Sequence, residues 1–400
     1  MFDLKILSSH EVELIMKSVE EFGGEVRFVG GCVRDYILKR QINDIDLVTN
    51  LLSDQIVSAL SYHGIRTILT NIKYGTVTAM FKNQSFEITT LRKDAECYGR
   101  KAEVKFTNEW QIDASRRDFT INALYVDRDG NLHDYFEGIK DLGLNKLRFI
   151  GEPEKRIKED YLRILRLFRL QAQLSFDNLE ETALFACKKY SLMLSSNVSG
   201  ERIRDEMFKL LECQNSVRAL EKMKEAGVLK HIISEKTDCS VLSSKLLFNT
   251  DKLVKLALLI RTTNEPNLGD ELSEFWHLSN KQKKRLLFLI ENFIDLSLPV
   301  REQKKYIVLF GKELYCDLIV ICGVMKDFDR KIVNQRIQLA NEFVIPKFPL
   351  SGKDLLNITY QPGEKLGKDL TSLREYWKDS DYSLTKTELI EIAKKLFKMY

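Results

Sequence analysis

Two aspartates, Asp44 and Asp46, stand two positions apart in the stretch NDIDLV. If this stretch is a strand, its side chains alternate between two faces, so both carboxylates point the same way while Ile45 and Leu47 face the sheet interior. Magnesium binds a few carboxylates together with water and substrate phosphates, and two such ions can clamp both oxygens of a phosphoryl displacement. Alone, the pair favours a solvated strand edge, and it is a candidate metal site only in combination with neighbouring motifs.

A glycine pair lies about ten residues before the first aspartate. Gly30 and Gly31 precede an expected helix that begins near Cys32 or Val33, and Arg34 lies in its first turn. Free backbone amides and the dipole at a helix start favour anions. Alone, the glycines favour an ordinary turn. Together with Arg34 and the two aspartates they predict a triphosphate site for nucleotidyl transfer.

Arg116, Arg117 and Asp118 adjoin one another in the stretch RRDF. The two guanidinium groups can donate to phosphate, and the carboxylate can accept a hydrogen bond from a ribose hydroxyl. The alternative is an ion pair that fixes the end of a strand, in which one of the arginines neutralises Asp118.

Asp160 and Arg163 stand three positions apart in EDYLR, and on a helix they would lie on one side. A carboxylate accepts from an exocyclic amine, and a guanidinium donates to a ring nitrogen. Cytosine and adenine both present this pattern, whereas guanine and uracil present the reverse. We therefore expect a protein template for C and A, with an intrahelical salt bridge as the alternative. Arg166 and Arg169 continue the three-residue spacing.

Two weaker candidates lie in the same part of the chain. Glu87, in SFEITTLR, is a candidate third carboxylate for the metals, with a surface or structural glutamate as the alternative. His133 and Asp134 invite comparison with metal-dependent HD phosphohydrolases. Such sites need further His and Asp ligands, and the five histidines of this chain are widely spread. We therefore assign His133 to a strand.

The elements that must position these residues change character near residue 151. Eleven of the nineteen glycines lie in residues 1–151, where runs such as VRFVG and GTVTAMFK predict strands and Asp129-Gly130 predicts a hairpin turn. Only five glycines lie in residues 152–345, where apolar residues recur at helical spacing. Expected helices there include 158–174, 178–194, 200–212 and 215–232. The sequence thus predicts one sheet with helices, followed by a helical remainder.

Composition narrows the class of protein. With 44% hydrophobic and 30% charged residues, the 400-residue chain is ordinary for a globular protein of more than one domain. Its net charge of +4 requires any nucleic acid to be held by a local basic face. Seven scattered cysteines favour a reducing compartment over a disulfide framework. Without a membrane-length apolar run, a signal core or an arginine-rich transit pattern, we expect a soluble, cytoplasmic protein.

Five stretches together resemble the motifs of class II tRNA nucleotidyltransferases and related bacterial poly(A) polymerases, within the DNA polymerase beta-like superfamily. They are residues 28–48, 113–124, 133–142, 159–169 and 200–207. All five occur in the order typical of the family, which is far more specific than any single motif. In this resemblance residues 113–124 recognise ribose and triphosphate, and residues 159–169 read the base, with Arg166 and Arg169 near the incoming nucleotide.

The resemblance implies an α+β fold, in which a polymerase-beta-like head with a mixed β-sheet precedes an all-α neck, body and tail. We place the catalytic head at 1–150, the neck with the base template at 151–210, a tRNA-binding body at 211–345 and a tRNA-binding tail at 346–400. Pro346 and Pro349 mark the last boundary. Basic residues of the tail could contact tRNA phosphates, although a solvated helical surface explains them nearly as well.

The implied activity is template-independent addition of CCA to the 3′ end of tRNA. The substrates would be CTP and ATP, the cofactor Mg²⁺ at a two-metal site, and the second product pyrophosphate. Asp44 and Asp46 would hold the metals, and residues 91–106 suit the mobile loop that family members use when they switch from C to A, with a plain solvated loop as the alternative.

Several alternatives remain. A poly(A) polymerase, a CC-adding enzyme and an A-adding enzyme would share the chemistry. An antibiotic-modifying nucleotidyltransferase would not require the helical part, and a silent tRNA-binding protein should have lost a metal carboxylate. The sequence leaves open whether the protein is a monomer or a homodimer.

Overall fold

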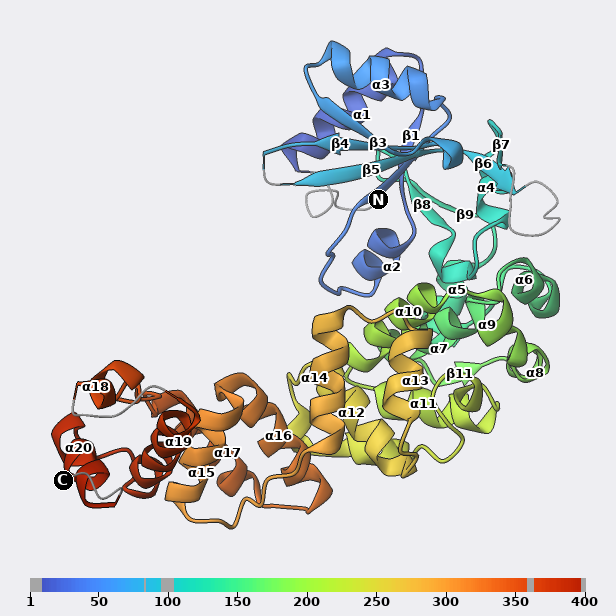
Figure 1. Cartoon of the computed structure of the whole chain (residues 1–400). Helices are drawn as coiled ribbons and strands as arrows, with labels where there is room; N and C mark the ends of the chain where they lie inside the picture. Colours follow the sequence, from blue (N-terminus) through green and yellow to red (C-terminus); the bar gives the residue numbers. More distant parts are fainter. Residues whose placement is uncertain (1–8, 83, 95–103, 358–362, 397–400) are drawn as a thin grey trace. The chain divides into compact units, whose positions relative to one another are not determined.

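The chain folds into two compact units, Met1–Lys236 and Thr237–Tyr400. The computed structural model describes residues 9–82, 84–94, 104–357 and 363–396, coloured along the chain in Figure 1. All of the predicted site residues fall in the first unit. Its architecture therefore decides whether they meet.

A seven-stranded sheet forms the centre of the first unit, with strand order β3-β4-β5-β2-β1-β8-β9. Its strands are β1 (Val26–Val29), β2 (Asp46–Thr49), β3 (Arg66–Asn71), β4 (Thr76–Met80), β5 (Ser85–Thr90), β8 (Leu124–Val126) and β9 (Leu132–Asp134). The neighbours β2 and β5 run parallel, and the other paired strands run antiparallel. The sheet is therefore mixed, as predicted.

Helices lie on both sides of this sheet. They are α1 (His10–Glu21), α2 (Gly31–Ile37), α3 (Ser53–Tyr62) and α4 (Trp110–Ser115), with 3-10 turns η2 (Ile72–Tyr74) and η3 (Thr120–Asn122). In Figure 1 α1 and α3 lie together on one side, whereas α2 lies on the other. Every residue of β1 is buried, including Arg27, whose guanidinium group pairs with Glu25. The glycine pair directly follows β1 at the start of α2, and the two aspartates lie where the chain enters β2.

The rest of the first unit is mainly helical and confirms the predicted change of character. It contains α5 (Gly138–Gly143), α6 (Pro153–Glu159), α7 (Arg163–Leu174), α8 (Glu181–Tyr190), α9 (Leu192–Asn197), α10 (Gly200–Glu212), α11 (Ser216–Glu225) and η4 (Leu229–His231). Two small sheets accompany them, β6 (Arg92–Asp94) with β7 (Val104–Phe106), and β10 (Lys146–Leu147) with β11 (Asn178–Leu179). The apolar face of α7 packs against α10 and α11. An α+β fold with a mixed sheet followed by helices is thus confirmed.

The predicted helix over 158–174 is wrong at its start. Asp160 has extended backbone angles, φ −152° and ψ 106°, and separates α6 from α7. Its carboxylate accepts a hydrogen bond from the backbone N–H of Leu162 at 3.1 Å. Aspartate competes in this way with helical hydrogen bonds, and so it starts a new helix instead of continuing the old one.

The second unit consists of helices and 3-10 turns in its described residues. They are η5 (Cys239–Ser243), η6 (Lys245–Leu247), α12 (Lys252–Thr263), α13 (Leu268–Phe275), α14 (Asn280–Glu291), α15 (Val300–Phe310), α16 (Lys312–Met325), α17 (Arg330–Glu342), α18 (Gly352–Leu356), α19 (Glu364–Asp379) and α20 (Lys386–Leu396). Its last three helices enclose a separate apolar cluster that includes Leu373, Trp377 and Leu389. Throughout the described part of the chain, no helix combines the length and apolar character that crossing a membrane requires.

Candidate functional site

A single cavity of about 570 Å³ in the first unit brings the predicted residues together. Its lining contains Gly30, Gly31, Arg34, Asp44, Asp46, Arg116, Arg117, Asp118, Asp160, Arg163, Arg166 and Arg169. These residues come from α2 and the residue before it, the start of β2 and the segment before it, the segment after α4, the α6–α7 junction, and α7 itself. Of the predicted site residues only Glu87 is absent from the lining.

The two metal-site candidates lie at the entrance to β2. Asp46 is the first residue of the strand, while Asp44 precedes it in the connecting segment and so lies outside the strand that the sequence predicted. Both side chains are open to the cavity, and Leu47 is buried. Removal from bulk water raises the pKa of Asp46, Glu87 and Asp44 raise it further, and Arg117 partly opposes them. A divalent cation would relieve this accumulation of negative charge.

Glu87 lies on β5 directly beside Asp46, because the two residues are register partners in the parallel β2–β5 pair. In the described part of the chain, His, Cys, Asp and Glu side chains nowhere form a group of three or more that could hold a metal. Asp44 and Asp46 alone therefore fit a cation that also takes oxygens from water and substrate phosphates, as magnesium does.

The glycine pair lies between two guanidinium groups. Gly30 has φ +77°, a conformation that side chains with a Cβ rarely adopt. A Cβ at Gly30 would lie 3.7 Å from Nη1 of Arg117, and a Cβ at Gly31 would lie 3.7 Å from Nη2 of Arg34. Since α2 has only seven residues, the guanidinium groups rather than a long helix dipole supply most of the positive charge. The glycines leave room for a phosphate beside both arginines.

Arg34 is buried and fixed on two sides. Its Nε and Nη2 donate to the two carboxylate oxygens of Asp35 at 2.9 and 2.8 Å, and its Nη1 donates to Oδ1 of Asn122 at 2.7 Å. A bidentate Arg–carboxylate pair fixes the plane of the guanidinium group. The remaining donors of Arg34 are thereby held in place beside the glycine pair.

Arg116 and Arg117 are held by Asp113, which is fully buried. Asp113 also accepts hydrogen bonds from the Tyr125 hydroxyl at 2.8 Å and from the backbone N–H of Arg92. Burial alone would raise the pKa of Asp113, but Arg117 and Arg116 outweigh it and hold the pKa below its ordinary value. Asp113 therefore orients both guanidinium groups at the cavity wall.

The alternative in which Arg116 or Arg117 neutralises Asp118 is wrong, because Asp118 pairs with another residue. Nη2 of Arg166, on α7, lies 2.7 Å from Oδ2 of Asp118. Oδ1 accepts from the backbone N–H of Phe119 and from Nδ2 of Asn122. Burial raises the pKa of Asp118, but Arg166 and these hydrogen bonds outweigh it, so the pKa is lowered overall. Asp118 is a charged acceptor at the cavity wall.

Asp160 and Arg163 both line the cavity but do not share a helical face. Oδ2 of Asp160 lies 2.7 Å from Nη2 of Arg202, the residue of α10 that also reaches this part of the unit. Arg163 is the first residue of α7 and is nearly buried. It donates to Glu159 and to the backbone carbonyl of Arg156. The intrahelical Asp160–Arg163 salt bridge is thus not the arrangement found.

The two remaining arginines of α7 differ in their partners. Arg166 pairs with Asp118, as described above. Arg169 donates to Glu206 of α10 and, at 2.9 Å, to Oε1 of Gln173. Both arginines line the cavity, and each is held by a carboxylate from a different element. Through these two ion pairs α7 contacts both Asp118, in the segment after α4, and Glu206 of α10.

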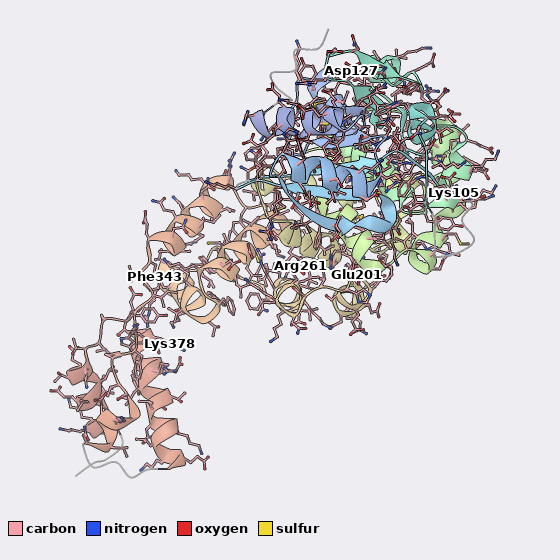
Figure 2. The ribbon with its side chains drawn as sticks, turned by 90° about the horizontal axis from the view of Figure 1, so that it is seen from above. Lys105, Asp127, Glu201, Arg261, Phe343 and Lys378 are labelled. Atoms are coloured by element: carbon pink, nitrogen blue, oxygen red, sulfur yellow. The ribbon has the colours of Figure 1, made fainter. Side chains whose placement is uncertain are left out.

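Two other sequence candidates have no place in the cavity lining. Nε2 of His133 lies 2.8 Å from Oδ2 of Asp127, which Figure 2 labels at the periphery of the first unit. The Asp134 carboxylate accepts from backbone N–H groups that follow it, among them that of Gly138. His133 lies on β9, as predicted. In the 91–106 stretch, β6 and β7 pair, and residues 95–103 lie outside the described residues.

Sequence reasoning missed several cavity residues. They include Asp35, Asn43, Arg92, Asn122, Gln173 and Lys209. Asp35 follows Arg34 directly, and Asn122 stands four positions after Asp118, so both lie inside stretches already singled out. They could have been predicted from their position, because a polar residue within such a motif often orients the side chain that contacts the substrate.

A mixed sheet with paired carboxylates beside a glycine pair, ringed by arginines, defines a nucleotidyltransferase. Comparison with known families supports this class. Residues 26–148 match the family model described as Poly A polymerase head domain, and residues 178–239 match that described as probable RNA and SrmB-binding site of polymerase A. Members of such families generally use divalent metal ions.

Relatives along nearly the whole chain identify the family. The mitochondrial CCA tRNA nucleotidyltransferase 1 of Danio rerio is 33% identical over 384 residues, covering 92% of this chain and 86% of that protein. The Mus musculus protein of the same name is 33% identical over 417 residues, covering 99% and 94%. The chain therefore belongs to the CCA tRNA nucleotidyltransferases, enzymes that add CCA to tRNA without a nucleic-acid template.

Solved structures agree at the level of the fold. The Bacillus stearothermophilus CCA-adding enzyme in complex with CTP superimposes with a TM-score of 0.79, covering 96% of this chain and 98% of that one. The sequence identity is 23%, so the likeness speaks for the fold alone. It matches the mixed sheet and the succession of helices described above.

Proposed function

We propose that the cavity of the first unit carries out the family's reaction, the addition of C, C and A to the 3′ end of tRNA from CTP and ATP. The observation that supports this best is that one cavity is lined by the two carboxylates, the glycine pair, the arginines and the Asp160–Arg163 base readers. In each cycle a 3′ oxygen would bond to the α-phosphorus while the bond to the β-phosphate oxygen breaks. Pyrophosphate then leaves.

Asp44 and Asp46 would hold the divalent cation, which we propose to be magnesium. The raised pKa of Asp46 and the absence of a third ligand within the described residues fit a cation that shares its coordination with phosphates and water. Bound there, the metal would activate the 3′-hydroxyl and neutralise charge on the triphosphate. Glu87 would act on Asp46 from the neighbouring strand.

Arg34 and Arg117 would receive the triphosphate beside Gly30 and Gly31. Both guanidinium groups are oriented before substrate arrives, Arg34 by Asp35 and Asn122, and Arg117 by Asp113. Donors fixed in advance lose little conformational entropy when they bind a charged ligand. Arg116, held by the same Asp113, would complete the phosphate contacts.

Asp118 would accept from the ribose, and Asp160 with Arg163 would read the base. Asp160 presents an acceptor and Arg163 presents donors from two sides of the α6–α7 junction. Because the pair is not joined in one ion pair, the edge of C or A could enter between the two side chains. Arg166 and Arg169 would line the path of the nucleotide.

We propose the functional division head 1–150, neck 151–210, body 211–345 and tail 346–400, with the last two parts contacting tRNA. Cys32, Cys187, Cys316 and Cys322 are free thiols, which favours a reducing compartment such as the cytoplasm. The fish and mouse relatives are named mitochondrial, so fractionation of cells with an antibody to this protein would decide between the two.

The decisive experiment extends a tRNA transcript that ends at the discriminator base, with magnesium and CTP alone, ATP alone or both. We expect a three-nucleotide extension only when both are present, no extension after EDTA, and none from Asp44→Asn. A stop after two cytidines would indicate a CC-adding enzyme. A long ladder with ATP alone would indicate a poly(A) polymerase.

A further inference from the structure

Asn122 lies between the residue proposed for the triphosphate and the residue proposed for the ribose. Its Oδ1 accepts from Nη1 of Arg34 at 2.7 Å, and its Nδ2 donates to Oδ1 of Asp118 at 3.2 Å. The two partners are 84 residues apart in sequence and come from α2 and from the segment before η3. One side chain thus bridges the two ends of a nucleotide's sugar-phosphate part.

Chemistry dictates the orientation of this amide. A guanidinium group can only donate, and an ionised carboxylate can only accept. The Asn122 oxygen must therefore face Arg34, and its nitrogen must face Asp118. The reverse orientation would lose both hydrogen bonds. Neither an acid nor a hydrophobic residue can provide this combination of one acceptor and one donor.

The amide also keeps two opposite charges apart. Arg34 and Asp118 both line the cavity and both contact Asn122. Without the amide, the guanidinium group and the carboxylate would face each other across a gap in a largely enclosed place. Direct pairing would then withdraw Arg34 from phosphate and Asp118 from ribose.

The bridge is one part of a longer network. Asp35 holds Arg34 at one end, and Arg166 of α7 holds Asp118 at the other. The network therefore runs from the glycine pair to α7, the helix that begins with Arg163. A substitution of Asn122 would therefore alter both the triphosphate contact of Arg34 and the ribose contact of Asp118.

We propose that Asn122 is a positioning residue that sets the spacing between the triphosphate contact of Arg34 and the ribose contact of Asp118. It thereby determines how strongly the enzyme prefers a ribonucleotide over a deoxyribonucleotide. This inference rests on the proposed roles of Arg34 and Asp118. Asn122 itself need not touch the reacting atoms.

Two substitutions test the bridge in different ways. In Asn122→Asp the new carboxylate still accepts from Arg34 but cannot donate to Asp118, which it repels. In Asn122→Ala both arms are lost. Tripolyphosphate, as an inhibitor against CTP, reports the phosphate arm alone. The ratio of kcat/KM for CTP to that for dCTP reports the ribose arm.

We expect the CTP/dCTP ratio of Asn122→Asp to fall about tenfold, the size of one lost hydrogen bond to a charged group. Its tripolyphosphate inhibition should weaken too, because the new carboxylate pairs with Arg34 and competes with phosphate for it. Asn122→Ala should weaken tripolyphosphate inhibition as well. Asn131→Asp is the matched control, because Asn131 also donates to an aspartate, Asp127, in a turn that does not line the cavity. It should leave both readouts unchanged.

The inference is overturned if Asn122→Asp keeps the original CTP/dCTP ratio, or if Asn122→Ala keeps both readouts. Thermal melting of each variant separates these results from misfolding, and Asn122→Ser provides a smaller polar replacement that should reproduce the Ala pattern. The unsubstituted protein could extend tRNA, and Asp118→Ala could lose the preference for CTP over dCTP, while the Asn122 variants keep that preference. This result would refute the role of Asn122 but leave the proposed function intact. Failure of the unsubstituted protein to extend tRNA refutes the proposed function itself.

Discussion

Asp46 and Glu87 are register partners on the parallel neighbours β2 and β5, so their side chains leave the same face of the sheet. Glu87 does not line the cavity, yet its charge helps to raise the pKa of Asp46. The relationship gives Glu87 an influence on the protonation of Asp46 without requiring Glu87 to be a metal ligand. It also explains why a carboxylate on the neighbouring strand was a reasonable candidate.

Glu87→Gln should shift the acidic limb of the kcat/KM profile to lower pH. Removing the negative neighbour lowers the pKa of Asp46, so this carboxylate stays charged at a lower pH and still binds the cation. The measurement is a pH–rate profile at saturating magnesium, with Glu13→Gln on α1 as the control. An unchanged acidic limb contradicts the electrostatic role. A higher magnesium requirement at every pH would make Glu87 a metal ligand after all.

Asp46→Asn should raise the thermal stability of the metal-free protein while it abolishes activity. The pKa of Asp46 is raised in the fold, so the folded state binds its proton more tightly than the unfolded state does. Stability therefore increases as the pH falls through the folded pKa, and at neutral pH the charged form is a cost that Asn removes. Melting curves at pH 7 in EDTA, with Asp54→Asn as the control, test this. A lower melting temperature for Asp46→Asn would contradict it.

Asp113→Asn should destabilise the first unit and weaken CTP binding. Asp113 is fully buried, pairs with Arg116 and Arg117, and accepts a hydrogen bond from the Tyr125 hydroxyl. Leaving the two guanidinium charges without a carboxylate costs about 3–5 kcal/mol. Since its pKa is lowered in the fold, this stabilisation is complete above the ordinary value of 3.8 and disappears as the pH falls through the folded pKa. Denaturant unfolding of the two proteins at pH 7 and in acid should show a difference that shrinks only in acid. A constant difference would contradict the linkage.

The sequence predicted which residues line the cavity better than it predicted their contacts with one another. Spacing and residue type were enough to select Asp44, Asp46 and the glycine pair, because those features are local. The partner of Asp118 could not be read in this way, since Arg166 reaches it from a helix 48 positions further on. Which of several arginines neutralises a given acid depends on how the elements pack.

The break at Asp160 shows the same limit at shorter range. Apolar periodicity continues smoothly through residues 158–174, and it predicts one helix. The competing hydrogen bond from Leu162 to the Asp160 side chain decides otherwise. Asn122 was missed for a different reason, because an amide has no chemistry of its own until its neighbours are known.

Asp160→Ala should relax discrimination against UTP and GTP while leaving the magnesium requirement unchanged. In the proposed role of Asp160 the substitution removes a hydrogen bond from the base to a charged acceptor, so the preference for CTP over UTP should fall about tenfold or more. Single-nucleotide incorporation on a tRNA transcript, with each triphosphate in turn, measures this preference.

Arg202→Ala tests the role of Asp160 in a second way. Arg202 pairs with Oδ2 of Asp160, so this substitution removes the partner but leaves the Asp160 carboxylate in place. Its loss should disturb the orientation of Asp160 and reduce the preference for CTP by less than Asp160→Ala does. Asp205→Ala, at an exposed position of the same helix, is the matched control and should behave like the original protein. If Asp160→Ala retains full selection against UTP, the base is read by other residues of the cavity, and Arg163 becomes the first to replace.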